Sequence, residues 1–94
     1  MNKLTILGNG YTAQFLSKEA QKKGFEVFIV SRNITNPKKN IHYLNFYDSK
    51  NVSKNLITNN IISTIPPDKN GTDPVISEYG EFIALNKNKI LYLS

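Results

Sequence analysis

A glycine pattern near the N-terminus constrains the fold of this chain more than any other feature. The segment Gly8-Asn9-Gly10-Tyr11-Thr12-Ala13 follows a short apolar run, Leu4 to Leu7, and opens a stretch of helical spacing that continues to Lys23. In such a pattern the first glycine allows a tight turn, the second lets a phosphate approach the backbone, and the small residue lets the helix pack close to the sheet. The pattern therefore predicts a strand, a phosphate-binding turn and a helix. The alternative is a tight turn in a parallel-sheet protein that binds no nucleotide.

The rest of the chain alternates between runs typical of strands and runs typical of helices. Predicted strands cover Phe25 to Val30, Ile41 to Phe46, Asn60 to Ile65 and Lys89 to Leu93, and predicted helices cover Asp48 to Leu56 and the stretch after Asp73-Pro74. Asp73 is suited to cap a helix whose first position is Pro74. Such alternation implies parallel strands joined by right-handed crossovers. The expected fold is α/β: a partial Rossmann fold with a five-stranded parallel sheet in order 3-2-1-4-5 and helices on both faces.

Length and composition limit the classes of function. Ninety-four residues with no cysteine and one histidine, His42, predict a single domain without a disulfide or a metal centre. The net charge of +5 comes from scattered lysines, and Tyr43, Phe46 and Tyr47 are spaced as core residues, so we expect no nucleic-acid partner. No apolar run approaches the ~20 residues that cross a bilayer, and nothing resembles a signal peptide. We therefore expect no membrane contact and a cytoplasmic location.

The end of the second predicted strand indicates which dinucleotide is preferred. An NAD site usually has Asp or Glu here to bind the ribose 2′-hydroxyl. This chain instead has Ser31 and Arg32, its only arginine, and no acid from there until Asp48. A guanidinium can bind a 2′-phosphate through two charge-assisted hydrogen bonds, so the sequence favours NADP over NAD. The alternative is an ordinary surface arginine. Asp48 is either an adenine contact or a helix N-cap.

Further segments carry a resemblance to a known family. With the motifs above, Ile62-Ser63-Thr64-Ile65-Pro66-Pro67, Gly71-Thr72-Asp73-Pro74-Val75 and Tyr92-Leu93-Ser94 resemble the atypical extended short-chain dehydrogenase/reductases. More narrowly, the chain is similar over essentially its whole length to NAD(P)-dependent epimerase/dehydratase-like proteins. The resemblance implies cofactor contacts from the glycine turn, from the end of the second strand and from the loop after the fourth. The predicted cofactor-binding residues are Gly8, Asn9, Gly10, Tyr11, Thr12, Ser31, Arg32, Thr64, Ile65 and Pro66.

The resemblance also implies that residues 1–94 are only the N-terminal NAD(P)-binding Rossmann domain of such a protein, without its substrate-binding region. No tyrosine is followed four residues later by a lysine, so the Tyr-x-x-x-Lys pair of active members is absent and no catalytic residue is assigned. We expect an NADP(H)-binding domain or fragment of an epimerase, dehydratase or reductase, not catalytic alone. The alternatives are a stand-alone nucleotide-sensing or interaction module and an inactive remnant of a split gene.

An open fifth strand bears on the partners. An apolar strand at a sheet edge invites pairing, and the sheet face beside the first helix is expected to be exposed over the fourth and fifth strands. Besides the dinucleotide, the expected partner is therefore a complementing C-terminal fragment or a second copy bound through the fifth strand.

Overall fold

The computed structural model describes residues 2–34, 37–86 and 90–92, the last three by their backbone. The strands are β1 (Lys3–Leu7), β2 (Glu26–Ser31), β3 (Ile41–Asn45), β4 (Asn60–Ser63) and β5 (Ile90–Tyr92), and the helices are α1 (Tyr11–Lys22), α2 (Ser49–Thr58) and α3 (Pro74–Leu85). Every strand pair in these ranges is parallel. The order β3-β2-β1-β4 confirms the predicted α/β fold over four strands, and the backbone of β5 pairs with the outer side of β4.

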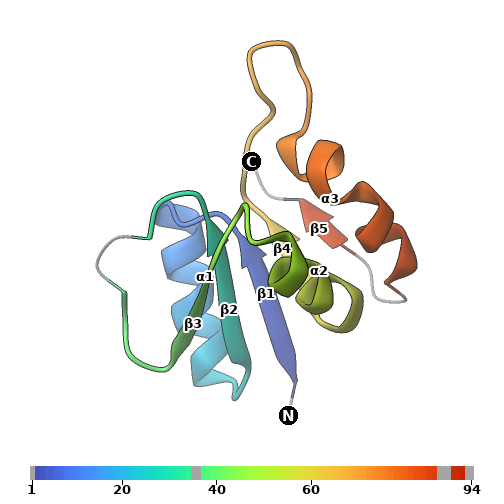
Figure 1. Cartoon of the computed structure of the whole chain (residues 1–94). Coiled ribbons are helices and arrows are strands. Elements are labelled where there is room, and N and C mark those ends of the chain that lie inside the picture. Colours follow the sequence, from blue (N-terminus) through green and yellow to red (C-terminus); the bar gives the residue numbers. More distant parts are fainter. Residues whose placement is uncertain (1, 35–36, 87–89, 93–94) are drawn as a thin grey trace.

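Two apolar layers hold the helices against opposite faces of the sheet (Figure 1). On one face, Ala13 of α1 packs in a cluster with Ile6 of β1. On the other, Leu56 of α2 and Tyr79 of α3 belong to a cluster with Leu7 of β1. Ile6 and Leu7 are adjacent, and neighbouring strand residues point to opposite faces. Burial on both sides thus explains why β1 is mostly apolar from Leu4 to Leu7.

The helix ends follow from local sequence. α1 is followed by Gly24, whose φ of +85° places it in the left-handed region that glycine adopts without strain. α3 begins where the carboxylate of Asp73 accepts hydrogen bonds from the backbone N–H groups of Val75 and Ile76, at 2.9 and 3.4 Å. Pro74 occupies the first turn, where its missing N–H is not needed. The predicted start of α3 at Asp73-Pro74 is confirmed, and α1 ends at Lys22, one residue before the predicted Lys23. No helix in the described ranges is long and apolar enough to cross a membrane.

Two sequence predictions about residues at the carboxyl ends of strands are wrong in detail. The fourth strand ends at Ser63 rather than Ile65, because its neighbour β1 ends opposite it at Leu7 and turns away. Thr64 and Ile65 therefore belong to a loop. Tyr47 is 64% exposed rather than part of the core, whereas Phe46 beside it is 3% exposed. β3 has ended by this point, so the strand alternation that predicted burial no longer holds.

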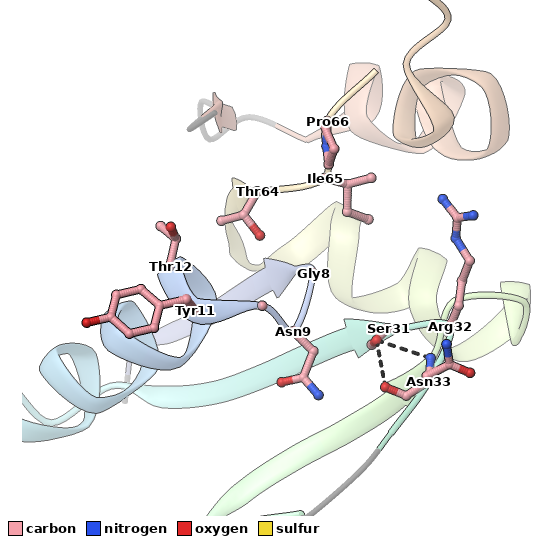
Figure 2. A pocket seen from close by; sticks show the side chains of 11 residues that line it. Gly8, Asn9, Tyr11, Thr12, Ser31, Arg32, Asn33, Thr64, Ile65 and Pro66 are labelled. Atoms are coloured by element: carbon pink, nitrogen blue, oxygen red, sulfur yellow. Dashed lines mark hydrogen bonds between the residues drawn. The ribbon is translucent and has the colours of Figure 1, made fainter. Parts of the chain in front are cut away.

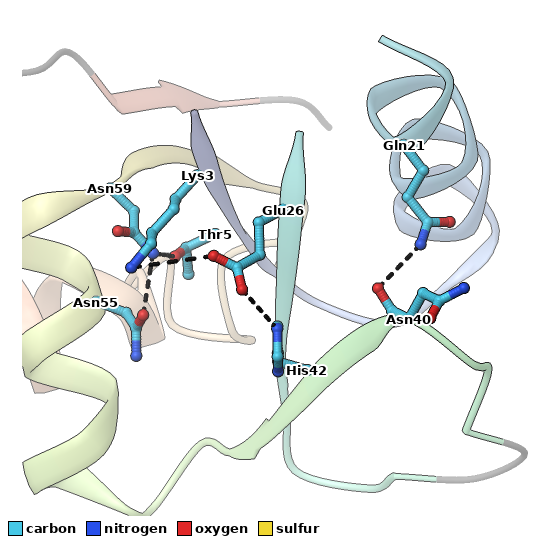
Figure 3. Close-up of polar contacts among 8 residues, drawn as sticks. All are labelled: Lys3, Thr5, Gln21, Glu26, Asn40, His42, Asn55 and Asn59. Carbon is cyan, nitrogen blue, oxygen red and sulfur yellow. Dashed lines mark hydrogen bonds and ion pairs between the residues drawn. The ribbon is translucent and has the colours of Figure 1, made fainter. Parts of the chain in front are cut away.

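Several polar side chains lie toward the amino-terminal ends of the strands (Figure 3). The fully buried Thr5 accepts a hydrogen bond of 2.9 Å from Asn59 Nδ2, which also donates to Asn55 Oδ1 at 3.0 Å. Because an unsatisfied buried amide would cost free energy, this bonding lets α2 close over a polar position of β1. On the same face, His42 Nε2 lies 2.9 Å from Glu26 Oε2 across β3 and β2.

A groove of about 400 Å³ runs beside α1 over β1 and β4. It is lined mostly by apolar residues, among them Leu4, Leu16, Ala20, Phe25 and Ile62. This groove corresponds to the part of the predicted apolar patch that lies over the fourth strand. The side chains of the fifth strand and residues 93–94, which the prediction also included, lie outside the described residues.

Candidate functional site

A cleft of about 520 Å³ opens at the carboxyl ends of β1, β2 and β4 (Figure 2). In the sheet, β1 lies between β2 and β4. The chain crosses from β1 to β2 through α1 on one face, whereas α2 and α3 cover the opposite face. The strand order therefore changes direction at β1, and in open α/β sheets the crevice outside the strand ends at such a point binds ligands. Eleven residues line it: Gly8, Asn9, Gly10, Tyr11, Thr12, Ser31, Arg32, Asn33, Thr64, Ile65 and Pro66. All ten predicted site residues are therefore brought together, along with Asn33.

The fold requires a glycine at position 8, whether or not a ligand binds. Its N–H donates to the Val30 carbonyl at 2.8 Å, and its φ of +122° is a conformation that L side chains rarely adopt. A Cβ on Gly8 would also collide with Oγ1 of Thr64. Thr64 is itself tied to β1, since its N–H and its hydroxyl both donate to the Leu7 carbonyl, at 2.8 and 3.1 Å. The turn after β1 and the loop after β4 are thus locked together.

Gly10 is not explained by the protein alone. Its φ of −84° and ψ of −167° suit any residue, and a Cβ there would meet no protein atom within 4 Å. It is the N-cap of α1, yet no side chain caps this helix and no acid lies in its first turn. The first N–H groups of a helix have no intrahelical partner and carry the positive end of its dipole. An anion in the cleft would find these donors open and the approach over Gly10 unobstructed.

Among the described residues, Arg32 is the only charged one that lines the cleft. The side chain is exposed, and no carboxylate of the described residues lies within ion-pair distance of its guanidinium. In Figure 2 it extends from the loop after β2 on the side where Ile65 and Pro66 lie. Arg32 also borders a hollow that Asp68 and Glu78 line, but neither carboxylate is within ion-pair distance, so the arginine still favours anions in the cleft.

Ser31 plays a more local part than the sequence predicted. Its hydroxyl donates to the Asn33 carbonyl at 2.9 Å and accepts from the Asn33 N–H at 3.2 Å. The serine therefore closes a small turn that carries Arg32. Asn33 was not predicted as a site residue. A serine two residues before it is the available signal, because serine hydroxyls bond to backbone groups two residues on.

The remaining lining residues shape the walls. Tyr11 is 92% exposed at the start of α1, and Asn9, in the loop before this helix, accepts a hydrogen bond from the side chain of Gln14 in α1. Asp48 lies outside the cleft at the N-cap of α2, where its carboxylate accepts from Asn51 Nδ2 at 2.9 Å. Of the two predictions for Asp48, the structure favours the helix terminus. The described residues contain no group of three or more His, Asp or Glu side chains that could hold a metal ion.

Comparison with known proteins bears on the fold. Neither a protein-family model nor a curated protein sequence matches the chain. Among solved structures, the crystal structure of a putative epimerase from Bacteroides thetaiotaomicron is similar, with a TM-score of 0.65 at 20% sequence identity. The fold is Rossmann-type. The match covers 97% of this chain and 46% of the Bacteroides chain, so this chain spans about half the length of that protein. The expected epimerase-like Rossmann fold is confirmed at the level of architecture.

Proposed function

We propose that this chain is an NADP(H)-binding domain of an epimerase-, dehydratase- or reductase-like protein related to the short-chain dehydrogenase/reductases. The observation that carries the proposal is Gly10, a glycine that neither backbone conformation nor packing requires. It stands at the uncapped N-terminus of α1, in the same cleft as Arg32, which forms no ion pair with a described carboxylate. A pyrophosphate passing over Gly10 and a second phosphate at Arg32 would use both features.

The residues divide by the part of the cofactor they would hold. Gly8, Gly10 and the first N–H groups of α1 would take the pyrophosphate, and Arg32 with the turn of Ser31 would take the 2′-phosphate of the adenosine ribose. Thr64 and the two residues after it would form the wall on the other side. When bound, a nicotinamide dinucleotide supplies hydride transfer. The chain would bind and orient the cofactor and would contribute no catalytic residue.

A second polypeptide segment would supply substrate recognition and chemistry. The Bacteroides protein supports this part of the proposal, because the present chain corresponds to less than half of it. The apolar groove beside α1 supports a contact with a complementing fragment or a second copy.

Calorimetric titration of the purified chain with NADPH and NADH tests the function. We expect tighter binding of NADPH, and we expect Arg32→Ala to weaken it roughly 10- to 100-fold, since hydrogen bonds to charged groups contribute about 1.5–3 kcal/mol. Binding of NADH should change by less than about twofold. Lys18→Ala removes an equal charge from an exposed position outside the cleft and serves as the control. A folded chain that binds neither dinucleotide would refute the proposal, and tighter binding of NADH would refute the selectivity.

A further inference from the structure

The guanidinium of Arg32 lies over the ring of Phe46. Its Cζ atom is 5.6 Å from the ring centroid, a distance at which the face of an aromatic ring attracts a cation. The phenylalanine side chain is only 3% exposed, whereas the arginine is exposed. A carboxylate would hold an arginine equally well but would cancel its charge. The ring holds the cation while leaving that charge available to a ligand.

Phe46 is itself fixed by its surroundings. Its backbone N–H donates to the carbonyl of Ser31 at 3.0 Å, which ties it to the strand that leads into Arg32. Its carbonyl accepts a hydrogen bond from the hydroxyl of Tyr79 in α3. The two rings pack edge to face, with centroids 5.3 Å apart and an interplanar angle of 78°. Both the backbone and the ring of Phe46 therefore depend on Tyr79, which is 1% exposed.

We propose that Phe46 and Tyr79 are positioning residues that set the preference of the cleft for a phosphorylated ribose by holding the Arg32 guanidinium in place. The inference rests on the proposed function and names what controls its selectivity. A long exposed side chain loses rotamer freedom when it binds a phosphate, and that loss opposes binding. A guanidinium already seated on a rigid ring has less freedom left to lose. The effect should appear for ligands that contact Arg32 and for no others.

Substitution of Phe46 by leucine removes the aromatic face while keeping an apolar side chain in the core. We expect Phe46→Leu to weaken NADPH binding roughly two- to fivefold and to leave NADH binding unchanged. In an Arg32→Ala background the same change should have no effect on either nucleotide. Tyr79→Phe keeps the packing but removes the hydrogen bond to Phe46, and should shift selectivity in the same direction to a smaller extent. Val52→Ala, in the same core cluster, is the control for a general loss of stability.

A measurement without nucleotide keeps this inference separate from the proposed function. A ring below the guanidinium should shift the Arg32 side-chain proton resonances upfield in the NMR spectrum of the free chain. The shift should disappear in Phe46→Leu and persist in Val52→Ala.

Absence of that shift in the wild type overturns the inference whether or not a nucleotide binds. Equal losses of NADPH and NADH affinity in Phe46→Leu, with NADPH still bound through Arg32, overturn it while the proposed function stands. A folded chain that shows the shift but binds neither dinucleotide refutes the proposed function and, with it, the role in selectivity.

Discussion

A single residue separates Gly8 from Gly10, yet different constraints account for the two glycines. Gly8 is held at a positive φ beneath the side chain of Thr64, so it serves the fold. Gly10 has an ordinary backbone conformation and open space where a side chain would lie. A sequence pattern treats the two as one motif, whereas their surroundings separate a structural position from a ligand-facing one.

Gly8→Ala should destabilise the chain. We expect the free energy of unfolding to fall by roughly 1–3 kcal/mol, because alanine must adopt a strained φ and displace Thr64. Urea denaturation followed by circular dichroism measures this loss. Adding Thr64→Ala should recover only part of it, since that change relieves the collision and leaves the strain. A Gly8→Ala variant as stable as the wild type would contradict the argument.

Gly10→Ser should separate binding from stability. Serine is a preferred N-cap residue, so the free energy of unfolding should stay the same or rise by about a few tenths of a kcal/mol. Its side chain would occupy the approach to the first turn of α1, and calorimetry should show at least a tenfold loss of NADPH affinity, about 1.4 kcal/mol. The control is Gly80→Ala in α3, which lies outside the cleft. Unchanged affinity in Gly10→Ser would show that no ligand passes over this residue.

At the scale of elements, the N-termini of the helices differ in how they are satisfied. The carboxylate of Asp73 caps α3, while the N-cap residues Gly10 of α1 and Asp48 of α2 make no such side-chain bond. Among these three helices, only α1 has its N-terminus in the cleft. The uncapped donors of α1 are therefore the ones that a ligand in the cleft could reach.

Asp73→Ala should lower the free energy of unfolding by about 1 kcal/mol, since two N–H groups of α3 lose their acceptor. Asp48→Ala is the matched control, because the same side chain is removed from an N-cap that makes no backbone bond. Thermal unfolding of both variants measures the difference. Equal losses would mean that the interaction of the acid with the helix dipole, rather than the cap, accounts for the effect.

At the scale of the whole molecule, burial of Tyr79 couples stability to pH. Burial raises the pKa of its hydroxyl above the ordinary value of 10.0, with Glu78 and Asp48 adding to the rise and the hydroxyl of Ser49 opposing it. A group whose pKa is raised by folding contributes stability that is complete below its unfolded pKa and is lost as pH rises through the folded value. Alkaline conditions should therefore weaken the packing of α3.

The wild type should lose stability above about pH 10, and Tyr79→Phe should lose less over the same window. At neutral pH the variant should be about 1 kcal/mol less stable, because the hydrogen bond to the Phe46 carbonyl is gone. Urea titrations at pH 8 to 11 measure both effects. Tyr47→Phe, at a 64% exposed position, is the control and should follow the wild-type profile. Parallel profiles for Tyr79→Phe and the wild type would contradict the assignment.

The apolar groove beside α1 predicts self-association of the purified chain. Sedimentation velocity over a range of concentrations should show a reversible shift from monomer to dimer, because apolar surface left uncovered on a small domain favours association. A single monomeric species at all concentrations would contradict this expectation. It would leave a complementing fragment as the proposed partner.

The sequence by itself determined the architecture over four strands and, with the family resemblance, predicted which segments come together in the cleft. The glycine turn, the continuous apolar strands and the Asp73-Pro74 start are local signals, because turn geometry, capping and burial on two faces each leave a pattern among neighbouring residues. They predicted the order of four strands. The family resemblance added the loop after the fourth strand, so ten of the eleven residues that line the cleft had been predicted.

Only the tertiary structure decided what each of those residues does. That Thr64 fills the space above Gly8 and that Arg32 lies over the ring of Phe46 follow from segments brought together by the sheet. Contacts of this kind leave no periodic pattern along the chain. Their partners are set by strand register and helix packing, which fix distances between residues far apart in sequence.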